Sequence, residues 1–250
     1  MSHQVLLAAC GAMTRSNIPH ILLQHLQSIE PNVNFTANLP LITSSTGARY
    51  YAKIGSSSER DQYAGEAESL KAMNIAAPGL SPKILVSGVT DGSDGERAGQ
   101  PYFLSEYKDL SGRLTDEAAD VLAKRLATEL HAYKSDMGFG FAVPTFCGAT
   151  RQENGWYDTW AEFYSQLIGG LLSKLKRKGR FDDLISKGEE VQRSVRTVVH
   201  RGIPYLLGSL NIEPVLLHGD LWSGNVGVDS SSGAPVIFDP SSMFGHNEAE

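Results

Sequence analysis

Three polar residues near the end of the chain, Asp220, Asn225 and Asp239, constrain its fold more than any other feature. Asp220 and Asn225 are five positions apart, and short apolar runs precede Asp220, follow Asn225 and precede Asp239. Short apolar runs bounded by turn residues are typical of strands, and the Ser- and Gly-rich stretch at 230–233 is typical of a hairpin turn. We therefore expect the three side chains to converge where short strands end.

The residue types at these positions indicate a chemistry. Phosphoryl transfer needs a carboxylate beside the attacking hydroxyl, a task that suits Asp220. It also needs oxygen ligands for Mg²⁺, which Asn225 and Asp239 can supply. The spacing matches the protein-kinase pattern H-R-D-x-x-x-x-N followed by D-F-G, with His218-Gly219-Asp220 as its first element. Asp and Asn often serve only as turn residues, but the joint spacing favours a kinase-like phosphotransferase.

Composition excludes several other classes. The formal net charge of −6 over 250 residues argues against a general nucleic-acid or membrane-surface binder. No apolar run approaches the roughly 18 residues of a membrane span, and the first residues lack the basic start of a signal peptide. Two cysteines, Cys10 and Cys147, cannot build a disulfide framework. We interpret them as free thiols and predict a cytoplasmic location.

The first half of the chain predicts a sheet with helices. Apolar spacing and turn residues predict helices over 17–29 and 58–74, and strands over 33–42, 48–54, 84–89 and 101–107. Strand alternation places Lys53 on the face opposite Ala52.

Glu66 lies on or beside the apolar stripe of the second helix, which comprises Tyr63, Ala67, Leu70 and Met73. A carboxylate beside a buried stripe requires a partner, and Lys53 on the preceding strand is the obvious candidate. The local pattern alone equally allows a solvated glutamate at the helix edge.

The second half is predicted to be mostly helical, over 115–134, 157–178 and 181–207. The chain therefore predicts an α+β, bilobal arrangement of the protein-kinase type. Residues 1–107 would form a nucleotide-binding lobe with an antiparallel sheet and one main helix. Residues 108–250 would form a helical lobe for substrate and catalysis, connected through Glu106, Tyr107 and Lys108.

The sequence of the predicted loop also resembles one family. His-Gly-Asp-Leu-Trp-Ser-Gly-Asn at 218–225, with Asp-Pro-Ser-Ser at 239–242 and Phe-Gly-His-Asn-Glu-Ala-Glu at 244–250, closely resembles the fructosamine kinase, or ketosamine kinase, family. Four further segments are similar in order and extend the resemblance over roughly residues 33 to 250: Tyr51 to Lys53, Gly65 to Leu70, Leu130-His131 and Gly155 to Trp160.

The resemblance implies a fold shared with aminoglycoside phosphotransferases. It also implies transfer of the ATP γ-phosphate to the 3-hydroxyl of a ketosamine, carried by an amine or by a protein lysine. The phosphorylated product is unstable, so the sugar then leaves the amine. It implies ATP and Mg²⁺ as cofactors, with neither nucleic acid nor membrane as a partner.

The same resemblance assigns roles to residues. Asp220 would accept or orient the hydroxyl proton, and Asn225 and Asp239 would hold Mg²⁺. Lys53 would contact the ATP phosphates, positioned by Glu66. Backbone groups near Glu106, Tyr107 and Lys108 would hold the adenine, and the Trp222 ring would lie against the sugar. His246 would lie near the substrate or serve a structural role, and His218 and His131 are expected to be structural.

The chain departs from the family in its phosphate loop and its length. No G-x-G-x-x-G precedes Lys53. The chain stops at Glu250, where the family continues with further helices, so we expect either a shortened protein or an incomplete chain. Two alternative functions are a kinase for another hydroxyl, such as an aminoglycoside or choline-type acceptor, and a nucleotide-binding pseudokinase. The physiological ketosamine and the oligomeric state are left open.

Overall fold

The computed structural model describes residues 18–92, 97–177 and 189–250. Its first half is built on a five-stranded antiparallel sheet in the order β1-β2-β3-β5-β4. The strands are β1 (Phe35–Asn38), β2 (Leu41–Ser44), β3 (Arg49–Ile54), β4 (Ile84–Val89) and β5 (Pro101–Glu106). Two helices flank this sheet, α1 (His20–Ile29) and α2 (Arg60–Ala76).

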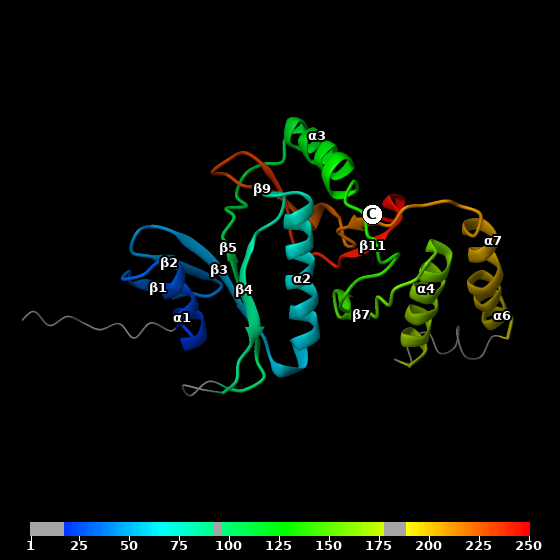
Figure 1. Ribbon diagram of the computed structural model, residues 1–250, viewed down its shortest axis with the longest axis horizontal. Helices are drawn as coiled ribbons and strands as arrows, with labels where there is room; N and C mark the ends of the chain where they lie inside the picture. The colour runs from blue at the N-terminus through cyan, green and yellow to red at the C-terminus, as the bar shows by residue number, and fades with distance from the viewer. Residues whose placement is uncertain (1–17, 93–96, 178–188) are drawn as a thin grey trace, which may run out of the picture.

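The two faces of the sheet are buried against different partners. Leu22 and Leu26 of α1 pack on Tyr50, Ala52 and Leu104 from one face. On the other face, Tyr63 of α2 packs against Phe103 with ring centroids 5.9 Å apart. Because strand side chains alternate, Lys53 shares the α2 face, as the sequence predicted. Figure 1 shows α2 standing between the sheet and the rest of the chain.

The strand predicted over 33–42 is wrong in one respect. The chain turns at Leu39-Pro40 and forms two paired strands, with Asn38 opposite Leu41. Proline has no N–H for a sheet ladder, which favours a turn at this point. The Pro40 carbonyl accepts a hydrogen bond from Ala52 N at 2.8 Å, so this turn is tied beside Lys53.

The second half contains helices and short paired strands. The helical segments are α3 (Asp116–Arg125) with a π-turn at Leu126–Leu130, α4 (Trp160–Arg177), α6 (Glu189–Thr197) with a π-turn at Val198–Gly202, and α7 (Ile203–Leu207). The strand pairs are β6 (Thr145–Cys147) with β7 (Thr150–Gln152), β8 (Val215–Leu217) with β11 (Met243–Gly245), and β9 (Val226–Val228) with β10 (Pro235–Ile237). The predicted hairpin at 230–233 is confirmed between β9 and β10.

Two helix predictions extend too far. The helix predicted over 115–134 ends at Leu130, because the residues after it pair with β8. Tyr133 O accepts a hydrogen bond from Leu216 N, and Lys134 forms a β-bridge with Val215. The helix predicted from residue 157 begins at Trp160, because Tyr157 pairs with Phe139 through two backbone bonds. Asn17, Lys178 and residues 181–188 of the predicted helices lie outside the described residues.

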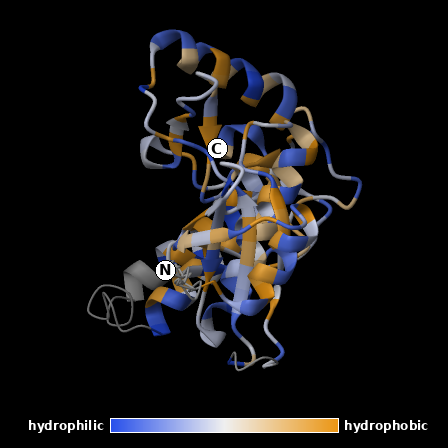
Figure 2. Cartoon of the chain, turned by 90° about the vertical axis from the view of Figure 1, so that its left-hand side faces the viewer, coloured by the Kyte–Doolittle hydropathy of each residue, from blue (hydrophilic) through white to orange (hydrophobic). Residues whose placement is uncertain are grey.

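A core joins α2 to strands β8 and β10. Leu70 and Met73 of α2 are buried with Leu130, Leu216 of β8 and Ile237 of β10. A second cluster around Trp160 and Phe163 packs α4 against β8 and β11. Figure 2 shows hydrophobic and hydrophilic residues alternating along the helices, the pattern expected when one face of each helix is buried. Both cores end at β8, and the loop that follows β8 is thereby held from two sides.

No helix within the described ranges is both long and apolar enough to cross a membrane. The division into lobes at residue 107 remains a prediction.

Candidate active site

The loop after β8 has a backbone that only glycine fits at one position. Gly219 has φ +82°, and a Cβ there would overlap the Ser241 carbonyl oxygen. Ser241 N in turn donates to His218 O at 2.9 Å, which fixes this close approach. The protein-kinase pattern has arginine at this position, and here the left-handed turn requires glycine.

His218 is fully buried and joins this loop to the end of β10. Its Nδ1 accepts the Asp220 N–H at 3.3 Å, so the proton lies on Nε2, which donates to Phe238 O at 3.0 Å. Burial lowers the pKa of His218, and the nearby Glu250 carboxylate only partly opposes this. His218 is thus a neutral structural bridge, as the sequence predicted.

Asn225 connects the three polar residues singled out in the sequence. Its Nδ2 donates to Asp220 O at 2.9 Å and lies 3.3 Å from Asp220 Oδ2 and 3.5 Å from Asp239 O. Its amide nitrogen therefore points at the two aspartates, and its amide oxygen is left as an acceptor. Asp239 has φ +54°, an uncommon conformation for a residue with a side chain. Such backbone strain is concentrated at functional sites.

Lys53 and Glu66 form an ion pair across the face of α2, with Nζ and Oε2 2.7 Å apart. The Glu66 side chain is only 12% exposed, which excludes the solvated alternative. Burial by itself lowers the pKa of Lys53, but the adjacent Glu66 carboxylate outweighs it and raises that pKa. The pair therefore favours the charged form of Lys53, while burial raises the pKa of the Glu66 carboxyl. Glu68, by contrast, lies away from this stripe and pairs with Lys71 at 2.7 Å.

Most of the predicted site residues meet around one cavity of about 250 Å³. Its lining includes Lys53, Glu66, Asp220, Trp222, Asn225 and Asp239. Trp222 is 61% exposed, so it is not a core residue, and its ring covers Gly224, where a Cβ would overlap it.

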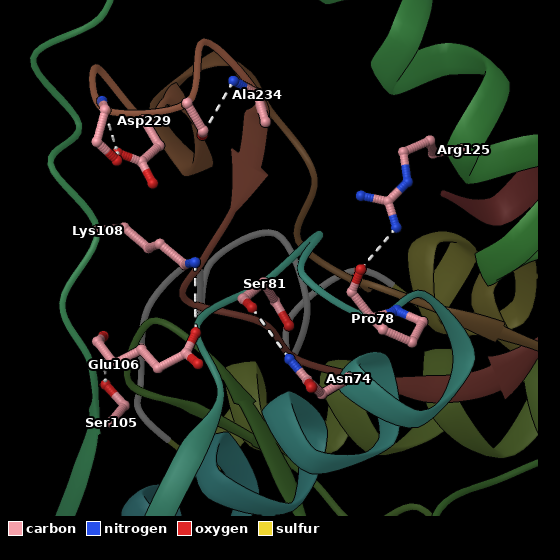
Figure 3. A network of polar contacts seen from close by, with 11 residues as sticks. Asn74, Pro78, Ser81, Ser105, Glu106, Lys108, Arg125, Asp229 and Ala234 are labelled. Atoms are coloured by element: carbon pink, nitrogen blue, oxygen red, sulfur yellow. Dashed lines mark hydrogen bonds and ion pairs between the residues drawn. The ribbon is translucent and has the colours of Figure 1, made fainter.

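A second cavity of about 260 Å³ adjoins the first, since Glu66 and Asp239 line both. Glu106, Tyr107 and Lys108 line this second cavity, together with apolar groups from both halves of the chain: Tyr51, Leu70, Phe103, Leu110 and Phe238. Figure 3 shows Lys108 reaching toward Glu106, whose carboxylate lies 3.3 Å from Lys108 Nζ. The guanidinium of Arg49 lies 4.5 Å from the centre of the Tyr107 ring.

His246 lies apart from these cavities. Its Nδ1 accepts the Glu248 N–H at 3.0 Å, and its ring lies 6.4 Å from Trp160. It lines neither of the two cavities, and these contacts favour the structural role.

Sequence reasoning assigned no role to Glu250, although its carboxylate anchors the loop that follows β8. Its carboxylate accepts the backbone N–H groups of His218 at 2.8 Å and Gly219 at 2.9 Å, and lies 3.1 Å from His131 Nε2. Burial alone would raise the pKa of Glu250, but these hydrogen bonds outweigh it and lower the pKa. No local pattern marks such a residue, because its partners lie about 30 and 120 positions earlier.

Cys147 was also assigned no role. Its Sγ lies 3.4 Å from Asp220 Oδ1, and the side chain is exposed. In the sequence, segment 138–148 stands out only for its glycine and aromatic residues, which do not indicate a particular structure. The β6–β7 hairpin was therefore not predicted.

The residue types at positions 225 and 239 suit the binding of a divalent cation. Asn225 and Asp239 offer an amide oxygen and a carboxylate on neighbouring strand ends, and Mg²⁺ prefers such hard oxygen donors. Asp239 shares its cavity with Asp220, so the site has an excess of negative charge beyond the Lys53–Glu66 pair.

Comparisons with known proteins place the chain in a family. The family model described as fructosamine kinase matches residues 25–250. A protein-ribulosamine 3-kinase, chloroplastic, of Oryza sativa subsp. japonica is 35% identical over 80% of this chain and 54% of its own length. A ketosamine-3-kinase of Mus musculus is 33% identical over 81% of this chain and 68% of its own. The chain thus spans about half the length of the rice relative and about two thirds of the mouse one.

A solved structure shares the fold. A candidate fructosamine-3-kinase from Haemophilus somnus 129PT aligns with a TM-score of 0.66 at 23% identity, over 83% of this chain and 63% of that one. A similar protein from Thermobifida fusca aligns with a TM-score of 0.65 at 21% identity, over 86% and 70%. The protein-kinase-like α+β fold predicted from the sequence is therefore confirmed. With its family model matched over nearly the whole length, this chain belongs to the fructosamine kinase family.

Proposed function

We propose that this chain is an ATP-dependent kinase that phosphorylates the 3-hydroxyl of ketosamines, on small amines or on protein lysines. The observation that carries the proposal is the meeting of Asp220, Asn225, Asp239 and the Lys53–Glu66 pair around two adjoining cavities. The mouse and rice relatives bear the names of ketosamine and ribulosamine 3-kinases, which supports this choice of acceptor over an aminoglycoside or choline.

The apolar second cavity would take the adenine ring. Its walls of Tyr51, Phe103 and Phe238 suit a flat aromatic ligand, with polar groups at Glu106 to Lys108 along one edge. Glu106 N is already bonded to Lys83 O, so Tyr107 and Lys108 would supply the backbone contacts. The boundary at residue 107 would then separate a nucleotide-binding lobe from a catalytic lobe.

Each polar residue would have one task. Lys53, held by Glu66, would contact the phosphates, and Asn225 and Asp239 would hold Mg²⁺, which neutralises charge on the transferred phosphoryl group when bound. Asp220 would take the proton of the acceptor hydroxyl as it attacks. Trp222, exposed beside Asp220, would pack its ring against the sugar.

The decisive experiment measures ADP release with Mg²⁺-ATP in the presence of fructosyl-lysine, ribulosyl-lysine or unmodified lysine. We expect release to depend on the ketosamines and not on lysine. ATP binding without ketosamine-dependent release would instead support the pseudokinase alternative, and release with simple amino alcohols would support the choline-type alternative. The cytoplasmic location stays a prediction, since the plant relatives are named chloroplastic.

A further inference from the structure

The β6–β7 hairpin forms one wall of the cavity that holds Asp220. Phe146 and Gly148 of this hairpin line that cavity opposite the catalytic loop. Between them, Cys147 places its sulfur 3.4 Å from Asp220 Oδ1. The hairpin is therefore in direct contact with the residue proposed to activate the acceptor.

The hairpin is held in this position by α2. Gln62 Nε2 donates to Gly148 O at 3.4 Å, and Arg151 pairs with Asp61 at 3.1 Å. Gly65 of α2 approaches so closely that a Cβ there would lie 2.5 Å from Pro144 O. Gly65 is the neighbour of Glu66, so the helix that positions Lys53 also positions the hairpin. These contacts with α2 fix the hairpin, and with it the position of Cys147.

The two oxygens of Asp220 have different neighbours. Asn225 Nδ2 lies 3.3 Å from Oδ2, and the Cys147 thiol donates to Oδ1. Burial and the Asp220 carboxylate both raise the pKa of Cys147, so its sulfur remains a neutral S–H donor. A hydroxyl that gives its proton to Asp220 must lie within about 2.6–3.2 Å of one carboxylate oxygen. Because Oδ2 faces Asn225, that oxygen is Oδ1.

We propose that Cys147 marks the position of the acceptor hydroxyl, an inference that rests on the function proposed above. In the free protein the thiol is the donor that holds Asp220 in place. A thiol is a weak donor, whereas an O–H bonded to a carboxylate is a strong one, so the acceptor hydroxyl displaces it at little cost. Cys147 is then a positioning residue for Asp220, and the β6–β7 hairpin is the wall that decides which acceptors fit.

The rate of Cys147 alkylation tests this inference without a substitution in the cavity. In a Cys10→Ser background Cys147 is the remaining cysteine of the sequence, and iodoacetamide labelling can be followed by mass spectrometry. Fructosyl-lysine at about ten times its Kd should slow labelling roughly tenfold, because only the free fraction reacts. Lysine, and Mg²⁺-ATP alone, should leave the rate unchanged. Equal labelling with and without saturating fructosyl-lysine, in protein that turns it over, would overturn the inference.

Variants separate a positioning role from a structural one. Cys147→Leu should raise the KM for fructosyl-lysine roughly tenfold and leave the KM for ATP unchanged. Cys147→Ala removes the donor that holds Asp220 in the free protein, so it should raise the KM for fructosyl-lysine with kcat unchanged, and Cys147→Ser, which keeps a donor, should restore the KM. Ala149→Ser, at the exposed turn of the same hairpin, is the matched control and should behave like the parent.

Different results would contradict the proposed function and the inference about Cys147. Parent protein without any ketosamine-dependent ADP release removes the proposed function and this inference with it. Active protein in which Cys147→Leu keeps the parental KM for fructosyl-lysine removes only the inference. A variant that fails to fold would also lose its heat stabilisation by Mg²⁺-ATP, and the labelling experiment then decides alone.

Discussion

The two sides of the candidate site are held together in different ways. On the sheet side, Lys53 is held by an ion pair with Glu66 of a separate helix, and its ammonium also lies over the rings of Tyr63 and Phe103. On the loop side, Asp220, Asn225 and Asp239 are connected by bonds to backbone groups, and Glu250 and His218 fix the loop from behind. Because these bonds end on backbone groups of the loop, the loop is backbone-held in the sense that it keeps its shape when the Asp220 side chain changes. Lys53, by contrast, loses its position when α2 shifts. Substitutions on the two sides should therefore fail differently.

The loop side should show the largest effect on turnover. Asp220→Asn keeps the size of the side chain but removes the proton acceptor, so we expect a loss on the order of 10²-fold or more. ATP affinity should be nearly unchanged, because Lys53, Asn225 and Asp239 remain. Steady-state ADP release and nucleotide titration measure the two quantities. A large loss of ATP affinity would show that the loop is not backbone-held.

The sheet side should show a smaller loss with intact folding. Glu66→Ala frees Lys53 from its position, and misplacement by about 1 Å can cost up to about 10²-fold in rate. Glu68→Ala is the matched control on the same helix, since Glu68 pairs with Lys71 at the surface. Greater sensitivity at Glu68 would contradict the arrangement described for α2.

The metal assignment can be tested through stability. A ligand that binds only the folded chain must stabilise it, so Mg²⁺-ATP should raise the Tm more than ATP with a chelator. Asp239→Asn should remove most of the Mg²⁺-dependent part. An identical Tm shift with and without Mg²⁺ in the parent would count against Asp239 and Asn225 as ligands.

The smallest effect is expected for substitution of Glu250, which supports the loop after β8. Glu250→Gln should lower the free energy of unfolding by about 1–3 kcal/mol at pH 7, the scale of hydrogen bonds to a charged group. The folded pKa of Glu250 is lowered, so its contribution is fully present above the unfolded value of 4.5 and is lost as pH falls below it. Urea unfolding should show the same difference between parent and variant at pH 7 and pH 5, and a smaller one at about pH 3 to 4. A difference independent of pH would exclude the charged anchor.

Local patterns predicted much of this molecule, but not the contacts between distant segments. The alternation of Tyr50 to Ile54 and the stripe at Tyr63 to Met73 placed Lys53 and Glu66 correctly, because both depend on short-range periodicity. The turn at Leu39-Pro40 was missed because the strand-like alternation over 33–39 leads directly into the apolar Leu41 and Ile42, with no glycine between them.

The roles of Glu250 and Cys147 could not be found in the same way. Each acts on a loop that lies far from it in sequence, and no spacing within either segment records that contact. Residue type and spacing supplied the proposed roles of Asn225 and Asp239, and the family resemblance agreed with them. Neither signal extended to the residues that support the loop from outside.

The shared wall of the two cavities has a consequence for inhibitor chemistry. At about 260 and 250 Å³, each falls below the range of roughly 300–1,000 Å³ in which drug-sized molecules usually bind. Glu66 and Asp239 line both, so a compound that fills one reaches the edge of the other. The shape of this protein therefore favours linked, two-headed compounds, with a flat ring between Phe103 and Phe238 and a polyol beside Trp222.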